Sequence, residues 1–239
     1  MEDLVLKILQ KGFNYSQDGP GNRLVYHLQG CNFACKWCSN ADSIPLENPK
    51  AKDFCVAEVF DEIIRSRMMF FDGGGVTFTG GEACVQADEL LELFKMLKAE
   101  GINTAIETNG SYLSLRNVAE YTDYLIIDLK HFDDETHRKW TGASNKSTKE
   151  NIEYFFSTGR QLHIRIPVIN GVNTAPEGFA DYFSKFDTSN AVFEFLAYHE
   201  FGKDKWQGEY QIENGFVSNE VIKNFTSVFE RHGLKTVVT

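Results

Sequence analysis

Short runs of β-branched and aromatic residues alternate with amphipathic stretches of helical period, most regularly from residue 75 onward. Such alternation is typical of repeated β-α units around a parallel sheet. It predicts strands at 23–30, 75–80, 102–108, 123–130, 161–169 and 191–199, with an edge strand at 234–239. It predicts helices at 56–71, 87–101, 114–121, 147–159, 176–186 and 219–233.

The stretch 87–101 shows the helical pattern most clearly. Leu90, Leu93, Phe94 and Leu97 recur on one face, and Gly101 stands where a C-terminal cap would end the helix. About six parallel strands with a helix each are fewer than the eight of a closed barrel. We therefore expect an α/β fold, a partial (β/α)6 barrel with parallel strands and outer helices. A doubly wound open sheet is the alternative, and in either fold the loops at the carboxyl ends of the strands build the active site.

Composition narrows the class of protein. The 239 residues are 42% hydrophobic and 24% charged, and no repeat or long linker divides them, so we expect a single domain over residues 1–239. The formal net charge of -10 argues against a nucleic-acid partner. No apolar run approaches the roughly 18 residues that span a bilayer, and the acidic start is unlike a secretory signal. We expect a cytoplasmic protein with no membrane partner.

Three of the five cysteines, Cys31, Cys35 and Cys38, lie within eight positions directly after the first predicted strand. Clustered thiolates are soft ligands for zinc or for iron-sulfur clusters, whereas five unevenly spaced cysteines do not suit a disulfide framework. A four-iron cube held by only three thiolates has one iron left to bind a substrate or cofactor. The alternatives are a structural zinc site with a histidine such as His27 as fourth ligand, or buried free thiols.

The C-x3-C-x2-C spacing, with the aromatic residue Trp37 before the last cysteine, resembles the motif of the radical S-adenosylmethionine (SAM) enzymes. The resemblance implies one [4Fe-4S] cluster bound by the three cysteines, and SAM chelated at the open iron, with Trp37 beside it. In that superfamily an electron from the cluster cleaves the sulfonium and gives a 5'-deoxyadenosyl radical.

The segment Gly80-Gly81-Glu82 follows the strand at 75–80. Two glycines before a helix commonly form a tight turn, and Glu82 would complement the helix dipole. The resemblance to radical SAM enzymes implies instead that this GGE segment contacts the amino group of the cofactor's methionine portion.

Further segments extend the resemblance over nearly the whole chain. In order they are DGPG at 18–21, GGGVTFTGGEA at 73–83, IETNG at 106–110, LIIDLKH at 125–131, HIRIPVI at 163–169 and YHEFGKDKW at 198–206. This series resembles the glycyl radical enzyme activating enzymes, most closely the pyruvate formate-lyase activating type. The likeness implies that the radical removes a hydrogen from a glycine on a C-terminal loop of a partner enzyme, pyruvate formate-lyase or a related lyase. Asp18 would help hold that loop.

Strand-end residues complete the expected site. The resemblance implies that Asp128, Lys130 and His199 help bind SAM, and that Glu107, Thr108 and Asp128 hold a monovalent cation. Oxygen ligands suit a hard cation. Strand-end turns and solvated charges are the local alternatives for these residues.

Arg165 lies in the strand predicted at 161–169 and could reach the adenosine or the partner loop. An arginine inside a barrel needs an anionic neighbour or a water channel. The stretch 202–210, which includes Trp206, could form a flap near the partner loop or a surface turn.

Only Cys55 lies between Cys38 and Gly80, so the ferredoxin-like insert of many activating enzymes is absent from this sequence. Electrons are therefore expected from an external donor, reduced flavodoxin or ferredoxin, under anaerobic conditions. We also expect the protein to be a monomer. Two alternatives stay open: a radical SAM enzyme acting on a small molecule, and a zinc-stabilised binding module that is not an enzyme.

Overall fold

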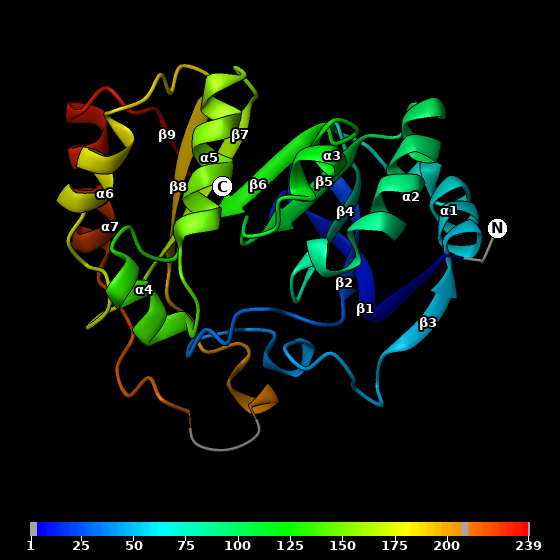
Figure 1. The fold of residues 1–239 in the computed structure, drawn as a ribbon, viewed down its shortest axis with the longest axis horizontal. Helices are drawn as coiled ribbons and strands as arrows, with labels where there is room; N and C mark the ends of the chain where they lie inside the picture. Colours follow the sequence, from blue (N-terminus) through cyan, green and yellow to red (C-terminus); the bar gives the residue numbers. More distant parts are fainter. Residues whose placement is uncertain (1–3, 207–209, 239) are drawn as a thin grey trace. The chain divides into compact units, whose positions relative to one another are not determined.

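The computed structural model describes residues 4–206 and 210–238 (Figure 1). Contacts between residues divide the chain into two compact units. The first unit takes in residues up to 32, 42–108 and 112–126, and the second takes in 33–41, 109–111 and the chain from 127 onward. Each unit is described by itself, and the expected single domain stays a prediction.

The first unit combines an antiparallel edge with parallel strands, hydrogen-bonded in the order β3-β1-β2-β4-β5. β1 is antiparallel to both β2 and β3, whereas β2, β4 and β5 run parallel. The strands are β1 (Val5–Tyr15), β2 (Asn22–Leu28), β3 (Lys52–Cys55), β4 (Gly75–Gly80) and β5 (Thr104–Thr108). The helices are α1 (Val56–Arg65), α2 (Ala87–Ala99) and α3 (Leu115–Ala119), with short 3-10 turns η1 (Ala41–Ser43), η2 (Arg67–Met69) and η3 (Ala83–Gln86).

The second unit repeats the strand-helix pattern. β7 is parallel to β8, and β8 is parallel to β9. β6 (Tyr124–Asp128) has its first three residues in the first unit and its last two in the second. The remaining elements are α4 (Asp134–Thr141), α5 (Lys146–Ser157), β7 (Leu162–Val168), α6 (Glu177–Phe183), β8 (Ala191–Ala197), η4 (Lys203–Lys205), α7 (Asn219–Arg231) and β9 (Thr236–Val237).

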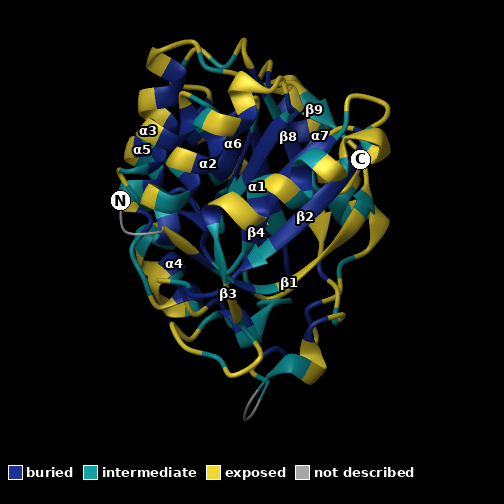
Figure 2. Cartoon of the chain, turned by 90° about the vertical axis from the view of Figure 1, so that its right-hand side faces the viewer, coloured by how far each residue is buried: buried dark blue, intermediate teal, exposed yellow. Residues whose placement is uncertain are grey.

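Burial follows the predicted hydrophobic pattern. In α2 the buried residues are Leu90, Leu93, Phe94 and Leu97, and Gly101 beyond the helix has a φ of +67°. Figure 2 shows β2 buried along most of its length, while α1 and α2 carry exposed residues on their outer faces. The six predicted helices are present, each with fewer residues than expected, and the predicted α/β class with mostly parallel strands is confirmed.

Apart from short 3-10 turns, two strands and one helix of the described chain were not predicted: β1, β3 and α4. β1 and β3 add an antiparallel edge to the first unit. Among the described residues, no helix is both long enough and apolar enough to cross a membrane.

Candidate active site

Cys31 lies in the first unit, three residues after the end of β2. The preceding Gly30 has a φ of +98°, and its amide donates to the Ser43 carbonyl over 2.8 Å. The Cys31 amide donates to the Ile44 carbonyl over 3.0 Å. Two successive amide hydrogen bonds therefore fix the backbone around this half-buried cysteine, which is in no disulfide.

The glycines at the end of β4 allow a close approach to the backbone that precedes Cys31. A Cβ on Gly81 would lie 2.1 Å from the Gly30 carbonyl oxygen, which is closer than any real contact. The Glu82 amide donates to that same oxygen over 2.8 Å. Gly80 has a φ of +113°, in the region that favours glycine. Tight packing of two backbone segments is thus one reason for glycine at these positions.

The Glu82 side chain is fully buried. Its Oε1 accepts hydrogen bonds from the Cys84 amide over 2.9 Å and from the Thr108 hydroxyl over 2.6 Å. Next to Thr108, the Glu107 carboxylate accepts from the Thr79 hydroxyl over 2.8 Å. Glu82 therefore caps η3 and joins the ends of β4 and β5. Its contact with a cofactor stays a prediction.

A hydrogen-bonded turn between β1 and β2 carries Asp18. The Ser16 amide donates to the Gly21 carbonyl over 2.9 Å and closes the turn. The Asn14 side-chain amide donates to the Asp18 carboxylate, and the Thr77 hydroxyl donates to the Asp18 carbonyl over 2.7 Å. Both the backbone and the side chain of Asp18 are thus held by the unit that carries Cys31.

The other two cysteines lie in a loop of the second unit, residues 33–41, whose backbone is bound to the end of α4. The Ala34 amide donates to the Thr141 carbonyl over 2.7 Å, and the Lys36 amide donates to the Trp140 carbonyl over 3.0 Å. The last carbonyl groups of a helix accept no hydrogen bond from within the helix, so they can accept from other segments. The end of α4 therefore supplies two backbone attachment points for this cysteine loop.

Within the cysteine loop, Cys35 is buried and Cys38 is half-buried. The Cys38 amide donates to the Cys35 carbonyl over 3.0 Å, and the Asn40 amide donates to the Cys38 Sγ over 3.4 Å. Trp37 is buried, and its ring centroid lies 6.5 Å from that of Trp140. The loop thus has a defined conformation in which an amide already points at one sulfur.

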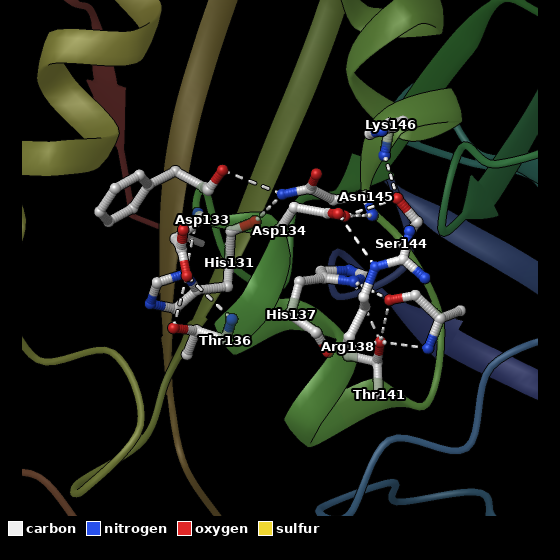
Figure 3. Close-up of polar contacts among 12 residues, drawn as sticks. His131, Asp133, Asp134, Thr136, His137, Arg138, Thr141, Ser144, Asn145 and Lys146 are labelled. Atoms are coloured by element: carbon white, nitrogen blue, oxygen red, sulfur yellow. Dashed lines mark hydrogen bonds and ion pairs between the residues drawn. The ribbon is translucent and has the colours of Figure 1, made fainter.

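Side chains hold the start of α4 in place (Figure 3). The Asp133 carboxylate accepts from the Thr136 amide over 2.8 Å and caps the helix. Asn145, which follows the helix, donates through Nδ2 to the His131 carbonyl over 2.8 Å and to the Phe132 carbonyl over 2.9 Å. Asn145 therefore ties the segment before α4 to the segment after it.

The far end of α4 is organised around His137, which is nearly fully buried. Its Nδ1 lies 2.7 Å from the Ala143 carbonyl oxygen and 3.0 Å from the Thr141 hydroxyl (Figure 3). Burial lowers the pKa of His137 below its ordinary value, so the ring is neutral and Nδ1-H donates to Ala143. The Phe33 ring packs edge-on against the imidazole, with centroids 5.2 Å apart. This end of the helix therefore contacts the cysteine loop through both backbone and side chains.

A lysine-carboxylate pair follows β6. The Lys130 Nζ lies 2.6 Å from the Asp128 Oδ2. Burial lowers the pKa of Lys130, but the charges of Asp128 and Cys35 outweigh burial and raise the pKa above its usual value. Lys130 is thus a firmly protonated cation in the electrostatic neighbourhood of the cysteine loop.

Arg165 on β7 is buried beside Glu194 on β8, its partner in the strand register. The Arg165 Nε donates to the Glu194 Oε2 over 2.7 Å, and the His163 Nε2 lies 2.9 Å from the same oxygen. Glu194 is therefore the anionic neighbour that a buried arginine requires. His199, two residues beyond β8, is exposed.

The stretch 202–210 begins against the cysteine loop. The Trp206 Nε1 donates to the Cys38 carbonyl over 3.0 Å. Residues 207–209 lie outside the described residues, so the expected flap stays a prediction.

The residues present fit an iron-sulfur cluster. Cys31, Cys35 and Cys38 form no disulfide, the Cys38 sulfur accepts an amide hydrogen bond, and the Lys130 cation stands near Cys35 and Cys38. In the described part of the chain, no three His, Cys, Asp or Glu side chains are grouped so that they could hold a single metal ion. Cys31 and Glu107 belong to the first unit, whereas Cys35, Cys38 and Asp128 belong to the second. The cluster and cation assignments therefore depend on sequence spacing and donor chemistry.

Two features of the site were missed by sequence reasoning. The carbonyls of Trp140 and Thr141 bind the cysteine loop, but a backbone acceptor carries no residue-type signal. Tyr112 was also missed: burial raises the pKa of its hydroxyl, and the charges of Glu82 and Cys31 add to the increase. Its position five residues after Glu107 in a strand-end loop was the only available hint.

Comparison with known proteins adds the family. Residues 25–183 match the model of the Radical SAM superfamily. The chain is 32% identical over 232 residues to the pyruvate formate-lyase 1-activating enzyme of Escherichia coli K12, covering 92% of this chain and 93% of that protein. It is 33% identical over 204 residues to the pyruvate formate-lyase-activating enzyme of Streptococcus mutans, covering 80% of this chain and 77% of the relative.

Solved structures agree on the fold. A domain of the pyruvate-formate lyase-activating enzyme from Bacteroides vulgatus superposes with a TM-score of 0.59 at 26% identity, covering 70% of this chain and 99% of that one. A radical SAM methyltransferase from Sphaerobacter thermophilus superposes with a TM-score of 0.68 at 16% identity, covering 96% of this chain and 72% of that one. The second likeness shows the fold alone, and it supports the partial barrel over the open doubly wound sheet.

Proposed function

Because the chain belongs to the radical SAM superfamily, and within it to the family of the pyruvate formate-lyase activating enzymes, we propose that it is the activase of a glycyl radical enzyme. The partner proposed is pyruvate formate-lyase or a related lyase. The reaction transfers one hydrogen from a glycine Cα of the partner to the 5'-deoxyadenosyl group. A radical SAM enzyme acting on a small molecule and a zinc-stabilised binding module are not favoured.

The observation that carries the proposal is the near-complete alignment with an activating enzyme. Identity of 32% extends over 92% of this chain and 93% of the relative, so the likeness takes in most of both sequences. The segments that resemble the activating enzymes, DGPG at 18–21 among them, lie within the same chain. A small-molecule enzyme of the same superfamily has no need of a turn that holds a protein loop.

Three thiols would hold the cluster: Cys31, Cys35 and Cys38. When bound, the cluster and SAM supply a one-electron reductive cleavage, which yields methionine and the radical that takes the glycine hydrogen. The chain's own contribution is positioning. The amide bonds around Cys31 and the attachment of the cysteine loop to α4 fix the backbone segments that carry the three cysteines.

Other residues would orient SAM and the partner. We assign Trp37, Gly80, Gly81, Glu82, Asp128, Lys130 and His199 to SAM. A protonated Lys130 suits a carboxylate, and the carboxylate of Glu82 suits an ammonium group. Glu107, Thr108 and Asp128 would hold a monovalent cation through oxygen. Asp18 and Arg165 would bind the partner's glycine loop, with Glu194 holding the arginine side chain in place.

The electron donor would be reduced flavodoxin or ferredoxin, because the chain has too few cysteines for an auxiliary cluster of its own. We propose that the protein works as a monomer that binds its partner transiently.

The test is anaerobic reconstitution with iron and sulfide, followed by incubation with SAM, a reductant and purified pyruvate formate-lyase. The expected results are roughly four iron atoms per chain, formation of 5'-deoxyadenosine, and the doublet of a glycyl radical in the electron paramagnetic resonance spectrum. Formation of 5'-deoxyadenosine with no glycyl radical on any candidate lyase would instead support a small-molecule substrate.

A pair of cysteine variants tests the cluster assignment. Cys35→Ala should lose the cluster iron and all formation of 5'-deoxyadenosine, while Cys55→Ala, outside the motif, should retain both. Equal iron content in the two variants would contradict the assignment. A colourless protein with one zinc per chain would support the binding module.

A further inference from the structure

Arg23, at the start of β2, is completely buried. Its Nε donates to the Thr77 hydroxyl over 2.7 Å, and its Nη1 donates to the Pro20 carbonyl over 3.1 Å and to the Asn103 side-chain oxygen over 2.9 Å. Its Nη2 donates to the Val76 carbonyl over 2.7 Å and to the Asn103 carbonyl over 3.4 Å. These contacts use all five donors of the guanidinium group.

All five acceptors are neutral oxygens, which makes this arginine unusual. Burial of a charge is costly unless it is compensated, and an apolar side chain of similar volume would fill the same space at lower cost. Burial lowers the pKa of Arg23 to about 10, so the group still carries its charge near neutral pH. Filling the core does not account for the residue, whereas holding several backbone segments in one geometry does.

The segment that Arg23 holds is the turn of residues 16–21. One bond goes directly to the Pro20 carbonyl. A second connection runs through Thr77, whose hydroxyl accepts from the Arg23 Nε and donates to the Asp18 carbonyl over 2.7 Å. Between these two anchored carbonyls lies Gly19, where a Cβ would approach to 3.1 Å from the Arg23 side chain.

The anchoring therefore fixes the backbone on both sides of Gly19, while the Asn14 side-chain amide holds the Asp18 carboxylate. The strand that supplies Thr77 is β4, which ends at the GGE segment. The turn is thus held by the same strand that leads to the predicted SAM contacts in this unit.

We propose that Arg23, acting through Thr77, is a positioning residue for the partner protein: it holds the turn of residues 16–21 so that Asp18 can bind the glycine-bearing loop. This inference rests on the proposed function, because the loop is supplied by a glycyl radical enzyme. Arg23 itself touches neither SAM nor the glycine in this proposal. Its loss should weaken recognition of the partner and spare the cleavage of SAM.

The test uses Thr77, where shape and hydrogen bonding can be separated. Thr77→Val keeps the shape and removes the connection, whereas Thr77→Ser keeps the hydroxyl. Thr122→Val is the matched control, because the Thr122 hydroxyl is equally buried and bonds a backbone carbonyl, that of Val118, within the same unit.

Three measurements are made on reconstituted enzyme. In the first, the KM for a synthetic peptide spanning the glycine loop of pyruvate formate-lyase should rise about tenfold in Thr77→Val, the size expected from one lost hydrogen bond that orders a binding group. In the second, formation of 5'-deoxyadenosine without peptide should match the wild type. In the third, hydrogen exchange of the amides of residues 16–21 should be faster in Thr77→Val alone, with Thr77→Ser and Thr122→Val like the wild type.

Arg23→Lys gives a second approach, because lysine keeps the charge but has only three donors for five acceptors. It should raise the same KM and accelerate exchange in the same turn. An unchanged KM in folded Thr77→Val, or an equal rise in Thr122→Val, would overturn the proposal. If the wild type cleaves SAM but never modifies the peptide or the intact lyase, the proposed function is wrong, and unchanged exchange in residues 16–21 would then overturn the positioning role separately.

Discussion

Replacement of Asn145 by alanine is the sharpest test of how the cysteine loop is supported. The side chain is almost fully buried and donates to the carbonyls of His131 and Phe132 over 2.8 and 2.9 Å. Alanine would leave both carbonyls without these donors. An unsatisfied buried acceptor costs about 1–3 kcal/mol. The His131 contact is buried and the Phe132 contact only partly so, which lets water repair the second. We therefore expect a loss of about 2–4 kcal/mol in the free energy of unfolding.

The measurement is urea unfolding followed by circular dichroism, with Asn190→Ala as the control. Asn190 also donates one side-chain hydrogen bond to a carbonyl, that of Gly159, but at an exposed position, so its loss should cost about 0.5 kcal/mol or less. The ends of α4 are joined through Asn145, and the helix holds the cysteine loop by two backbone bonds. Asn145→Ala should therefore also retain less iron after reconstitution and gel filtration than Asn190→Ala. Equal unfolding free energies for the two variants would refute the account of α4.

Two further predictions concern backbone packing and pH. Gly81→Ala should lower the iron content and the stability strongly, because its Cβ would meet the Gly30 carbonyl oxygen at 2.1 Å, whereas Gly12→Ala, with nothing within 4 Å, should behave like the wild type. The pKa values of His131 and His137 are lowered by burial, so the unfolded chain binds protons that the folded chain does not, and stability should fall as the pH drops below about 6.5. Urea unfolding midpoints across this pH range measure the effect. His137→Asn, which keeps a donor for the Ala143 carbonyl, should flatten the dependence of stability on pH. An unchanged slope of stability against pH in this variant would argue against a neutral buried His137.

The alternation of strands and helices could be predicted because packing follows simple periods. Each predicted helix has an apolar face that its unit buries, as in α2, and each predicted strand from 75 onward is a short apolar run between turn residues. These patterns are local, so they can be recognised without knowing which other elements each helix or strand packs against. The ends of the helices were less well predicted, since caps depend on contacts that the pattern does not show.

β1 and α4 could not be predicted for opposite reasons. β1 mixes charged and apolar residues with a largely exposed second half, and it is stabilised by pairing with two neighbours rather than by its own composition. α4 is a polar helix that buries only His137 and Thr141. Its stability comes from a cap and from asparagine bonds to the flanking backbone, contacts that become visible only once the chain has folded.

For the GGE segment, the sequence motif and the structure give different reasons why these residue types stand at positions 80–82. The resemblance to radical SAM enzymes assigns Gly81 and Glu82 to a cofactor, while the structure gives each residue a role in packing: one leaves room for the Gly30 carbonyl, and the other caps η3 and binds Thr108. Packing and hydrogen bonding alone would favour a glycine at 81 and a side-chain acceptor at 82, so these residue types do not by themselves demonstrate ligand binding. Arg23 presents the reverse case, because it lies outside the residues assigned to the site and yet its burial with neutral acceptors is hard to explain by packing. In this chain, a buried charged residue that packing does not require is therefore better evidence of function than a residue whose type packing already explains.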